Sequence, residues 1–284
     1  MIPASFDYES PKTLNEALAL LASREDAKLL AGGHSLLPAM KLRLASPALL
    51  IDLGRVAGLD YVRDAGDSIS IGALTTHATV ASSQLLHASS PLLAQAAAHI
   101  GDIQVRNRGT IGGSLAQAHP AADYPAAVLA LSAQMVTASK TGERVIPAAS
   151  FFTGMFTTAL RSDEIITEIR VPKTTGAATV YKKFEHPASG YAVVGVAVVV
   201  RGTSARIEDV AVGITGVGEI AYRAAAVETA LRGKPASAIA EAAGHAADKI
   251  EALGDNFASA EYRRHMAQVY TRRALQEALA AKRR

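Results

Sequence analysis

Residues 27–53 read AKLLAGGHSLLPAMKLRLASPALLIDL, and this stretch decides the fold of the amino-terminal part of the chain. A short strand predicted over residues 28–31 runs into the glycine pair Gly32-Gly33, and a helix over 36–44 and a buried strand over 49–53 follow. Upstream, Thr13 and Glu16 have the spacing of a capping box at the start of another helix. Alternating helices and strands of this kind favour a small parallel sheet.

A second glycine pair stands in the segment TIGGS, residues 110–114. It lies inside residues 101–124, a polar stretch without clear periodicity that we predict to be a long functional loop. Glycine pairs let the backbone turn sharply and approach a ligand, and successive N–H groups can bind an anion. Either pair alone is more often an ordinary turn. Two pairs flanked by the hydroxyls of Ser35, Thr110 and Ser114 suit a diphosphate held between two loops.

A third glycine run, GVGEIA at residues 216–221, matches the G-x-G-x-x-A dinucleotide pattern after a predicted strand. That pattern normally has an acidic residue about 20 positions further on and a second parallel strand. Neither is present here, because helices are predicted next. We therefore interpret this run as a strand-to-helix connection.

The chain divides into three predicted parts, residues 1–54, 55–174 and 175–284. The middle part begins with paired strands over 61–63 and 68–71 and two helices over 76–87 and 91–100. After the linker KTTGAA (173–178), strands over 179–184, 191–201 and 207–215 precede helices over 222–231, 237–253 and 259–281. In this last part the strands come first and the helices follow, which indicates a separate α+β domain. The fold class predicted for the whole chain is therefore α+β.

Composition narrows the possible chemistry. The 284 residues include no Cys, which excludes disulfides, Cys-ligated zinc, iron–sulfur clusters and a thiol nucleophile on this chain. Redox chemistry would therefore need an external cofactor. No stretch resembles a signal peptide, and no apolar run approaches the roughly 20 residues of a membrane-spanning helix. We expect a cytoplasmic protein without a membrane span.

The net charge of +3 is small and the basic residues are dispersed, which does not favour nucleic-acid binding. One basic cluster lies on the predicted final helix, where a solvated face is favoured over a partner interface. Its members are Arg263, Arg264, Arg272, Arg273, Lys282, Arg283 and Arg284.

Few other side chains suggest a site. Asp123, before Tyr124-Pro125, is either a helix N-cap or a carboxylate that accepts hydrogen bonds from ribityl or ribose hydroxyls. Four histidines are not at metal-ligand spacings, so we predict no metal site and assign most of them to loops or the surface. They are His34, His77, His99 and His119. No G-x-S-x-G elbow occurs, and we assign no catalytic residue.

Two long stretches, AGGHSLLPAMKLRLASPALLIDL (31–53) and QVRNRGTIGGSLAQAHPAADYPA (104–126), resemble the medium, FAD-binding subunits of the xanthine dehydrogenase and molybdenum hydroxylase family. The likeness is greatest to carbon monoxide dehydrogenase medium subunits. FDYESPKTLNEAL (6–18) and EYRRHMAQVYTRRAL (261–275) fit as well, so it covers nearly the whole chain. The resemblance implies a two-subdomain FAD-binding fold of the vanillyl-alcohol oxidase (PCMH) type. A smaller carboxy-terminal domain, with a three-stranded antiparallel sheet and three helices, would follow it.

The resemblance also implies a cofactor site. It places the FAD diphosphate against the two glycine pairs, Asp123 on the polyol chain, and Ile166 and Lys183 toward the adenine and isoalloxazine ends. Tyr191 falls beside the flavin, where it would limit access. Around Tyr191, many relatives carry an Arg and an Asp, whereas this chain has His186 and Gly190, so the electron acceptor stays open. The complete set is Leu29, Leu30, Ala31, Gly32, Gly33, His34, Ser35, Leu36, Ile100, Thr110, Ile111, Gly112, Gly113, Ser114, Asp123, Ile166, Lys183 and Tyr191.

By the same resemblance, the chain would work with a large molybdopterin subunit and a small subunit that carries 2Fe-2S clusters, assembled as a dimer of heterotrimers. Electrons would pass from the clusters to FAD and on to an acceptor. The alternative is a stand-alone FAD-dependent oxidoreductase. A weaker alternative is a non-enzymatic binding module that uses the basic final helix.

Overall fold

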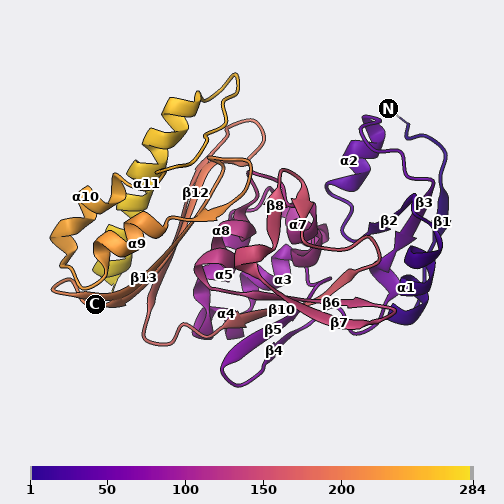
Figure 1. Ribbon diagram of the computed structural model, residues 1–284. Helices are drawn as coiled ribbons and strands as arrows, with labels where there is room; N and C mark the ends of the chain where they lie inside the picture. Colours follow the sequence, from indigo (N-terminus) through magenta and orange to yellow (C-terminus); the bar gives the residue numbers. More distant parts are fainter. Residues whose placement is uncertain (1, 282–284) are drawn as a thin grey trace.

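The structure, a computed structural model, describes residues 2–281 (Figure 1). Three sheets of three, five and four strands follow one another along the chain, together with a two-stranded ribbon. We call them the amino-terminal, middle and carboxy-terminal sheets. In Figure 1 the middle sheet and its helices lie between the other two sheets.

The amino-terminal sheet is parallel, as the strand–helix alternation predicts. Its central strand β3 (Leu49–Asp52) pairs with β1 (Asp7–Glu9) and with β2 (Ala27–Leu30). The predicted capping box opens α1 (Leu14–Ser23): the Glu16 N–H donates to Thr13 Oγ1 over 3.2 Å, and the Thr13 N–H donates to Glu16 Oε2 over 3.2 Å. Strand β1 was not predicted, because all three of its residues are exposed and show no apolar pattern.

The middle sheet is antiparallel, with the order β4-β5-β10-β6-β7. Its helices gather on one side of the sheet in Figure 1. The strands are β4 (Val62–Asp64), β5 (Ser68–Gly72), β6 (Gln134–Ser139), β7 (Gly142–Pro147) and β10 (Ile165–Pro172). The helices are α3 (His77–Ser82), α4 (Gln84–Ser89), α5 (Pro91–Ala98), α6 (Ile103–Arg108), α7 (Ile111–Gln117) and α8 (Asp123–Ala130). Helix α2 (Leu36–Lys41) lies between β2 and β3 in the sequence and belongs to the amino-terminal part of the chain. Shorter elements are η1 (Leu53–Arg55), η2 (Ala148–Ser150), β8 (Phe152–Gly154) and β9 (Thr157–Thr158).

The prediction of a long irregular loop over residues 101–124 is wrong. Two short helices, α6 and α7, occupy most of it. Each begins at a side-chain cap: Asp102 Oδ1 accepts from the Val105 N–H over 2.9 Å, and Thr110 Oγ1 accepts from the Gly113 N–H over 3.2 Å. Helices this short leave little periodicity in the sequence, so caps and tertiary packing determine them.

The carboxy-terminal sheet has four strands, one more than predicted. Strands β11 (Ala178–Glu185), β12 (Ala192–Gly202) and β13 (Ile207–Thr215) match the prediction, and β14 (Tyr222–Arg223) pairs with β13. The glycine run 216–221 therefore connects two antiparallel strands rather than a strand and a helix. Helices α9 (Ala225–Leu231), α10 (Ile239–Ala243) and α11 (Ala260–Ala281) follow, with η3 (Ala236–Ala238) before α10, which is much shorter than predicted.

Strand β12 is buried on both faces, which explains its unbroken apolar sequence. Val196, Val198 and Val200 point into a core shared with α9 and α11. The intervening Ala197 points into the middle core, which contains every residue of α8 from Tyr124 to Ala130 except Pro125. Helix α8 thus belongs to the middle part of the chain and packs on the carboxy-terminal sheet.

The contact between α8 and β13 is a close approach of two backbones at Gly213. A Cβ on Gly213 would lie 2.0 Å from the Ala126 carbonyl oxygen, so no side chain fits between the helix and the strand. Glycine at this position lets the two parts of the chain dock directly.

Replacing Gly213 with Ala is expected to destabilise the protein by about 1–3 kcal/mol, because the helix and the sheet must move apart. Gly154→Ala is the matched control, since a Cβ there meets only Thr157, at 3.6 Å. Urea unfolding of both variants measures the difference. Equal stability of the two variants would mean that α8 does not need this close approach.

Candidate functional site

The two glycine pairs, about 80 residues apart in the sequence, lie together in the structure. A Cβ on Gly32 would be 2.1 Å from the Arg108 carbonyl oxygen and 2.7 Å from the Gly109 Cα. A Cβ on Gly113 would lie 3.6 Å from the Ala31 Cβ. The loop after β2 therefore packs against the segment that opens α7, and the two glycine loops form one joint site.

The first glycine loop presents free backbone donors. Gly33 has a φ of +77°, a conformation that L side chains rarely adopt. Within residues 2–281, the N–H groups of Gly33, His34 and Ser35 have no hydrogen-bond partner. The Ser35 hydroxyl caps no amide, although Ser35 precedes α2. Consecutive free N–H groups next to a free hydroxyl form a suitable cradle for a phosphate.

The second glycine loop differs from the prediction, because its amides are already hydrogen-bonded. The Ile111 N–H donates to Thr75 O over 3.0 Å, and the Gly112 N–H donates to Ala73 O over 2.8 Å. The Gly113 and Ser114 amides are used in the cap of α7, by the Thr110 hydroxyl and carbonyl. This loop therefore contributes close packing and the Ser114 hydroxyl rather than an open row of N–H groups.

His77 lies beneath the joined loops, and sequence reasoning did not identify it. Its side chain is buried, its N–H donates to Gly109 O over 2.9 Å, and its Nδ1 lies 3.2 Å from the Tyr124 hydroxyl. Burial lowers the pKa of His77 to about 4, so the ring is neutral at neutral pH. A Cβ on Gly109 would meet its Nε2 at 2.5 Å. From the sequence, most of the four histidines are assigned to loops or the surface, and His77 is not singled out, because nothing in its neighbours indicates burial.

Asp123 and Lys183 form a buried ion pair between α8 and β11. The Lys183 Nζ lies 3.0 Å from Asp123 Oδ1 and also donates to the His99 carbonyl over 2.8 Å. The Tyr181 hydroxyl donates to Asp123 Oδ1 over 2.6 Å. Burial raises the pKa of Asp123 to about 6, despite the opposing effects of Lys183 and Tyr181. Ala122 holds the N-cap position, so the N-cap interpretation of Asp123 is wrong.

The apolar residues assigned to the site take up two positions. Leu29, Leu30 and Leu36 are half-buried around the first loop, with Leu30 Cδ1 3.4 Å from the position of a Gly33 Cβ. Ile166 is buried in the middle core, which also contains Ile111, and Ile100 packs against this core.

Tyr191, directly before β12, belongs to a partly exposed aromatic group. Its ring stacks on His119 with centroids 4.3 Å apart, and Phe156 packs edge-on against His119 at 5.2 Å. Burial raises the pKa of Tyr191, and the negative charge of Asp123 adds to this effect. Tyr191 and His119 line a pocket of about 270 Å³. Tyr191 therefore lies within electrostatic range of the Asp123–Lys183 pair.

The basic cluster of the final helix is not uniformly solvated. Arg263 is buried, and its guanidinium donates to Val193 O over 2.8 Å, to Gly216 O over 2.7 Å and to Asp255. Arg264 is exposed, as predicted. Lys282, Arg283 and Arg284 lie outside the described residues.

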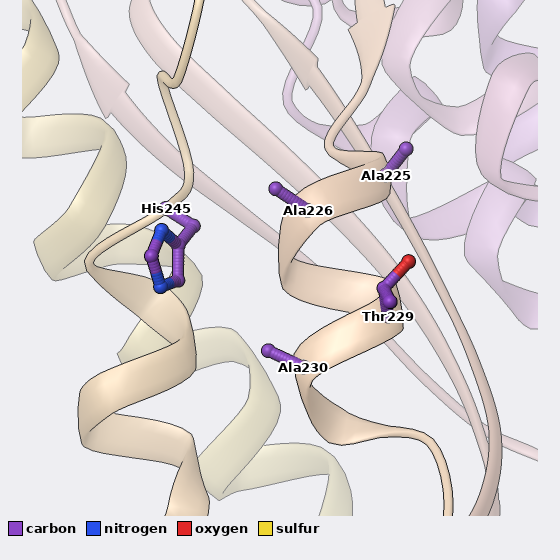
Figure 2. A pocket seen from close by; sticks show the side chains of 5 residues that line it. All are labelled: Ala225, Ala226, Thr229, Ala230 and His245. Atoms are coloured by element: carbon purple, nitrogen blue, oxygen red, sulfur yellow. The ribbon is translucent and has the colours of Figure 1, made fainter.

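A second hollow, of about 440 Å³, lies beside α9 (Figure 2). Figure 2 shows Ala226 and Ala230 pointing toward the segment that carries His245. His245 is the one titratable residue among those that line it, so the hollow offers little chemistry. Across residues 2–281, no three His, Asp or Glu side chains are grouped so that they could hold a metal ion. In the same range, no helix is long and apolar enough to cross a membrane.

The fold and the site define a flavoprotein. Residues 4–174 match the family described as the FAD binding domain in molybdopterin dehydrogenase. Residues 179–278 match the CO dehydrogenase flavoprotein C-terminal domain. The chain belongs to the family of FAD-binding medium subunits of carbon monoxide dehydrogenase-type molybdenum hydroxylases. This confirms the resemblance inferred from sequence and the predicted fold class.

Individual relatives agree over the full length. The chain is 42% identical to the carbon monoxide dehydrogenase medium chain of Hydrogenophaga pseudoflava, over 99% of both chains. It is 37% identical to the glyceraldehyde dehydrogenase medium chain of Sulfolobus acidocaldarius, over 98% of this chain and 99% of that one. The solved carbon monoxide dehydrogenase from H. pseudoflava superposes with a TM-score of 0.95 at 43% identity, and each chain is 99% covered. These relatives are components of different dehydrogenases.

Replacing Lys183 with Met should destabilise the FAD-free protein by about 3–5 kcal/mol at pH 8, because Asp123 would be left buried without its counter-ion. The pKa of Asp123 is about 6 in the folded chain, against an ordinary value of 3.8. The folded chain therefore holds the Asp123 proton more tightly than the unfolded chain does. The contribution of Asp123 to the free energy of unfolding falls as the pH rises from 3.8 to about 6. Losing Lys183 raises the folded pKa further, so the variant should be less impaired at pH 5 than at pH 8.

Urea unfolding at pH 5 and pH 8 measures both effects. Lys182→Met is the control, because Lys182 pairs with Glu277 on the surface and its loss should cost little. A Lys183 variant with the same stability deficit at both pH values would contradict a buried ion pair.

Proposed function

We propose that this chain is the electron-transfer subunit of a multi-subunit molybdenum hydroxylase. It takes electrons from the iron–sulfur clusters of a small partner subunit into FAD and passes them to an external acceptor. A large partner subunit with molybdopterin oxidises the organic substrate. The observation that carries the proposal is the joining of the two glycine loops on a chain that has no Cys to ligate a cluster.

The residues present fit FAD. The first loop offers free N–H groups at Gly33, His34 and Ser35, which suit the diphosphate. On the second loop, a Cβ at Gly113 would meet only the Thr110 hydroxyl and Ala31, so the Gly113 backbone faces space between the loops. Both features are those of a cradle that a backbone forms around a flat or extended ligand.

The remaining assigned residues surround this cradle. We propose that Asp123 accepts hydrogen bonds from the polyol hydroxyls, since it is ionised at neutral pH beside Lys183. Leu29, Leu30, Leu36 and Ile100 supply apolar contacts, while Ile166, Lys183 and Tyr191 belong to the adenine and isoalloxazine ends. Bound FAD supplies the redox chemistry, and the protein binds, orients and tunes it. No side chain is assigned as a general acid, general base or nucleophile.

The partners are inferred from the relatives. Several relatives are named medium chains or subunits of dehydrogenases or hydroxylases, which supports a complex with large and small subunits. We propose a dimer of heterotrimers in the cytoplasm, with molybdopterin and 2Fe-2S clusters on the partner chains. The substrate is determined by the large subunit, since relatives of similar identity belong to enzymes named for carbon monoxide, glyceraldehyde and nicotine.

Gly33→Val and Gly113→Val should each weaken FAD binding by about tenfold to a hundredfold. Val at position 33 disturbs the loop whose free amides suit the diphosphate, and Val at position 113 fills space between the two loops. Gly66→Val is the control for Gly33, since its φ of +79° imposes the same strain in a turn where a Cβ meets nothing within 4 Å. Flavin fluorescence titration gives the affinity, and thermal unfolding of the FAD-free chains gives stability. Full FAD affinity in both loop variants would mean that the two loops are ordinary turns that do not bind the cofactor.

The purified chain should bind one FAD non-covalently, so that acid precipitation leaves the yellow cofactor in the supernatant. After chemical reduction it should pass electrons to a dye, but it should oxidise no organic substrate of the complex. Co-purification from the source cells should recover a molybdopterin subunit and an iron–sulfur subunit. Substrate turnover by this chain, with no partner detectable by mass spectrometry, would establish the stand-alone oxidoreductase instead.

A further inference from the structure

Tyr181 is a buried residue of β11 whose hydroxyl meets the Asp123 carboxylate. The side chain is 5% exposed, and its ring belongs to the apolar core of the middle part of the chain. The hydroxyl donates to Asp123 Oδ1 over 2.6 Å. Burial raises the pKa of Tyr181 well above its ordinary value, and the charge of Asp123 adds to this, so the hydroxyl keeps its proton. A core residue thus presents a constant donor to the carboxylate that we assign to the polyol chain.

Helix α5 and strand β12 hold Tyr181 in place. Strand β11 lies at the edge of its sheet, where outward-facing backbone groups need partners other than a strand. The Tyr181 N–H donates to Gln95 Oε1 of α5 over 3.0 Å, and Gln95 Nε2 donates to Thr179 O over 3.3 Å. On the side of β12, a Cβ on Gly195 would overlap the Tyr181 hydroxyl, so glycine leaves the space that this hydroxyl occupies. The hydroxyl is therefore fixed where it reaches Asp123.

Tyr181 and Lys183 together fix the direction of the Asp123 carboxylate. Residues two apart on a strand point to the same face, and both of these side chains reach Asp123. The Lys183 Nζ lies 3.0 Å from Oδ1 and donates to Oδ2 over 3.1 Å, while the Tyr181 hydroxyl donates to Oδ1. A carboxylate has about four acceptor sites on its two oxygens, so these three interactions leave a site on Oδ2.

Other titratable groups face Asp123 and Tyr181 from the elements packed around them. They are Lys183 and Glu185 of β11, His99 after α5, Tyr191 before β12, and Tyr124 of α8 itself. Burial raises the pKa of Asp123 to about 6 and Glu185 adds to this, whereas Lys183 and Tyr181 lower it. Burial lowers the pKa of His99. Because His99 is the same in all variants, comparing two variants at one pH cancels its contribution.

We propose that Tyr181 is a positioning residue for the cofactor, because it fixes the Asp123 carboxylate in the direction that lets Oδ2 accept from a polyol hydroxyl. The inference rests on the proposed function, since it takes Asp123 to contact the polyol chain of FAD. Tyr181 acts through Asp123 and does not itself touch FAD. A donor to a carboxylate also stabilises the ionised form. Loss of the hydroxyl should therefore raise the pH below which FAD is released, whereas a purely structural tyrosine would affect FAD binding equally at every pH.

The first test follows FAD affinity against pH. Tyr181→Phe removes the hydroxyl and keeps the ring. A hydrogen bond to a charged group corresponds to a pKa shift of about one unit or more. In flavin fluorescence titrations, this variant should therefore bind FAD about tenfold more weakly than the wild type at pH 5.5, and less than about threefold more weakly at pH 8.5. Tyr222→Phe is the control, because it loses a hydroxyl that donates to Ala246 O over 3.0 Å beside the carboxy-terminal core. It should bind FAD as the wild type does at both pH values.

A second variant reaches the same hydrogen bond from the neighbouring strand. In Gly195→Ala the added Cβ displaces the Tyr181 hydroxyl without removing it. This variant should show the same loss of FAD affinity at pH 5.5 and the same recovery at pH 8.5.

The second test needs no FAD. Urea unfolding of FAD-free Tyr181→Phe should show a larger drop in the urea midpoint at pH 8 than at pH 5, because the variant must keep Asp123 ionised without its donor at pH 8. At pH 5 Asp123 is largely protonated in the folded chain, so the missing donor matters little.

Asp123→Asn distinguishes a failure of this inference from a failure of the proposed function. It should weaken FAD binding at pH 8.5 and remove the pH dependence that Asp123 causes. If it does so while Tyr181→Phe keeps the wild-type profile, or loses affinity equally at both pH values, the positioning role of Tyr181 is wrong. Full FAD affinity in Asp123→Asn would instead contradict the proposed contact between Asp123 and the cofactor. An equal drop in the urea midpoint at both pH values would show that Tyr181 does not support the charge of Asp123.

Discussion

The contact between Gly32 and the backbone at Arg108 and Gly109 is the constraint on which the rest of the structure depends. At 2.1 Å from the position of a Cβ, the carbonyl of Arg108 leaves room for glycine alone. Strand β2 of the amino-terminal sheet ends just before Gly32, and α7 begins just after Gly109. This one contact therefore joins the amino-terminal and middle parts of the chain. The packing at Gly32 is followed directly by the three free amides of the first loop, Gly33, His34 and Ser35.

Helix α8 makes the second connection between parts of the chain, and this connection buries a charged side chain. Its residues fill the space between the middle core and the carboxy-terminal sheet, and Gly213 lets its backbone lie against β13. Its first residue, Asp123, is a carboxylate in a position that water hardly reaches. Lys183 and Tyr181 of β11 compensate for this burial, so the same side chains that tie the two parts of the chain together also set the charge at the proposed cofactor site.

Sequence reasoning succeeded where local chemistry determines the structure. The capping box at Thr13, the parallel sheet around residues 49–53 and the paired glycines were predicted from neighbours in the sequence, and the glycine pairs do meet. It failed where distant partners determine the structure. Helices α6 and α7 depend on caps and packing, and the amides of residues 111 and 112 are used by Thr75 and Ala73. His77 and Arg263 are buried by elements far away in the sequence, so their own neighbourhoods do not show it. The assignment of individual residues to FAD stays a prediction, as does the three-part division of the chain.

In the proposed FAD site, the position of Asp123 and Lys183 on different parts of the chain would link cofactor supply to the lifetime of the protein. A ligand held by groups from both parts favours the state in which they are docked. At a free concentration one hundred times its Kd, such a ligand adds about 2.7 kcal/mol to the stability of the folded chain. Proteases act mainly on opened chains, so a cell short of flavin would remove this subunit faster than it removes the loaded one. The number of complete complexes would then follow the flavin pool, without any dedicated regulator.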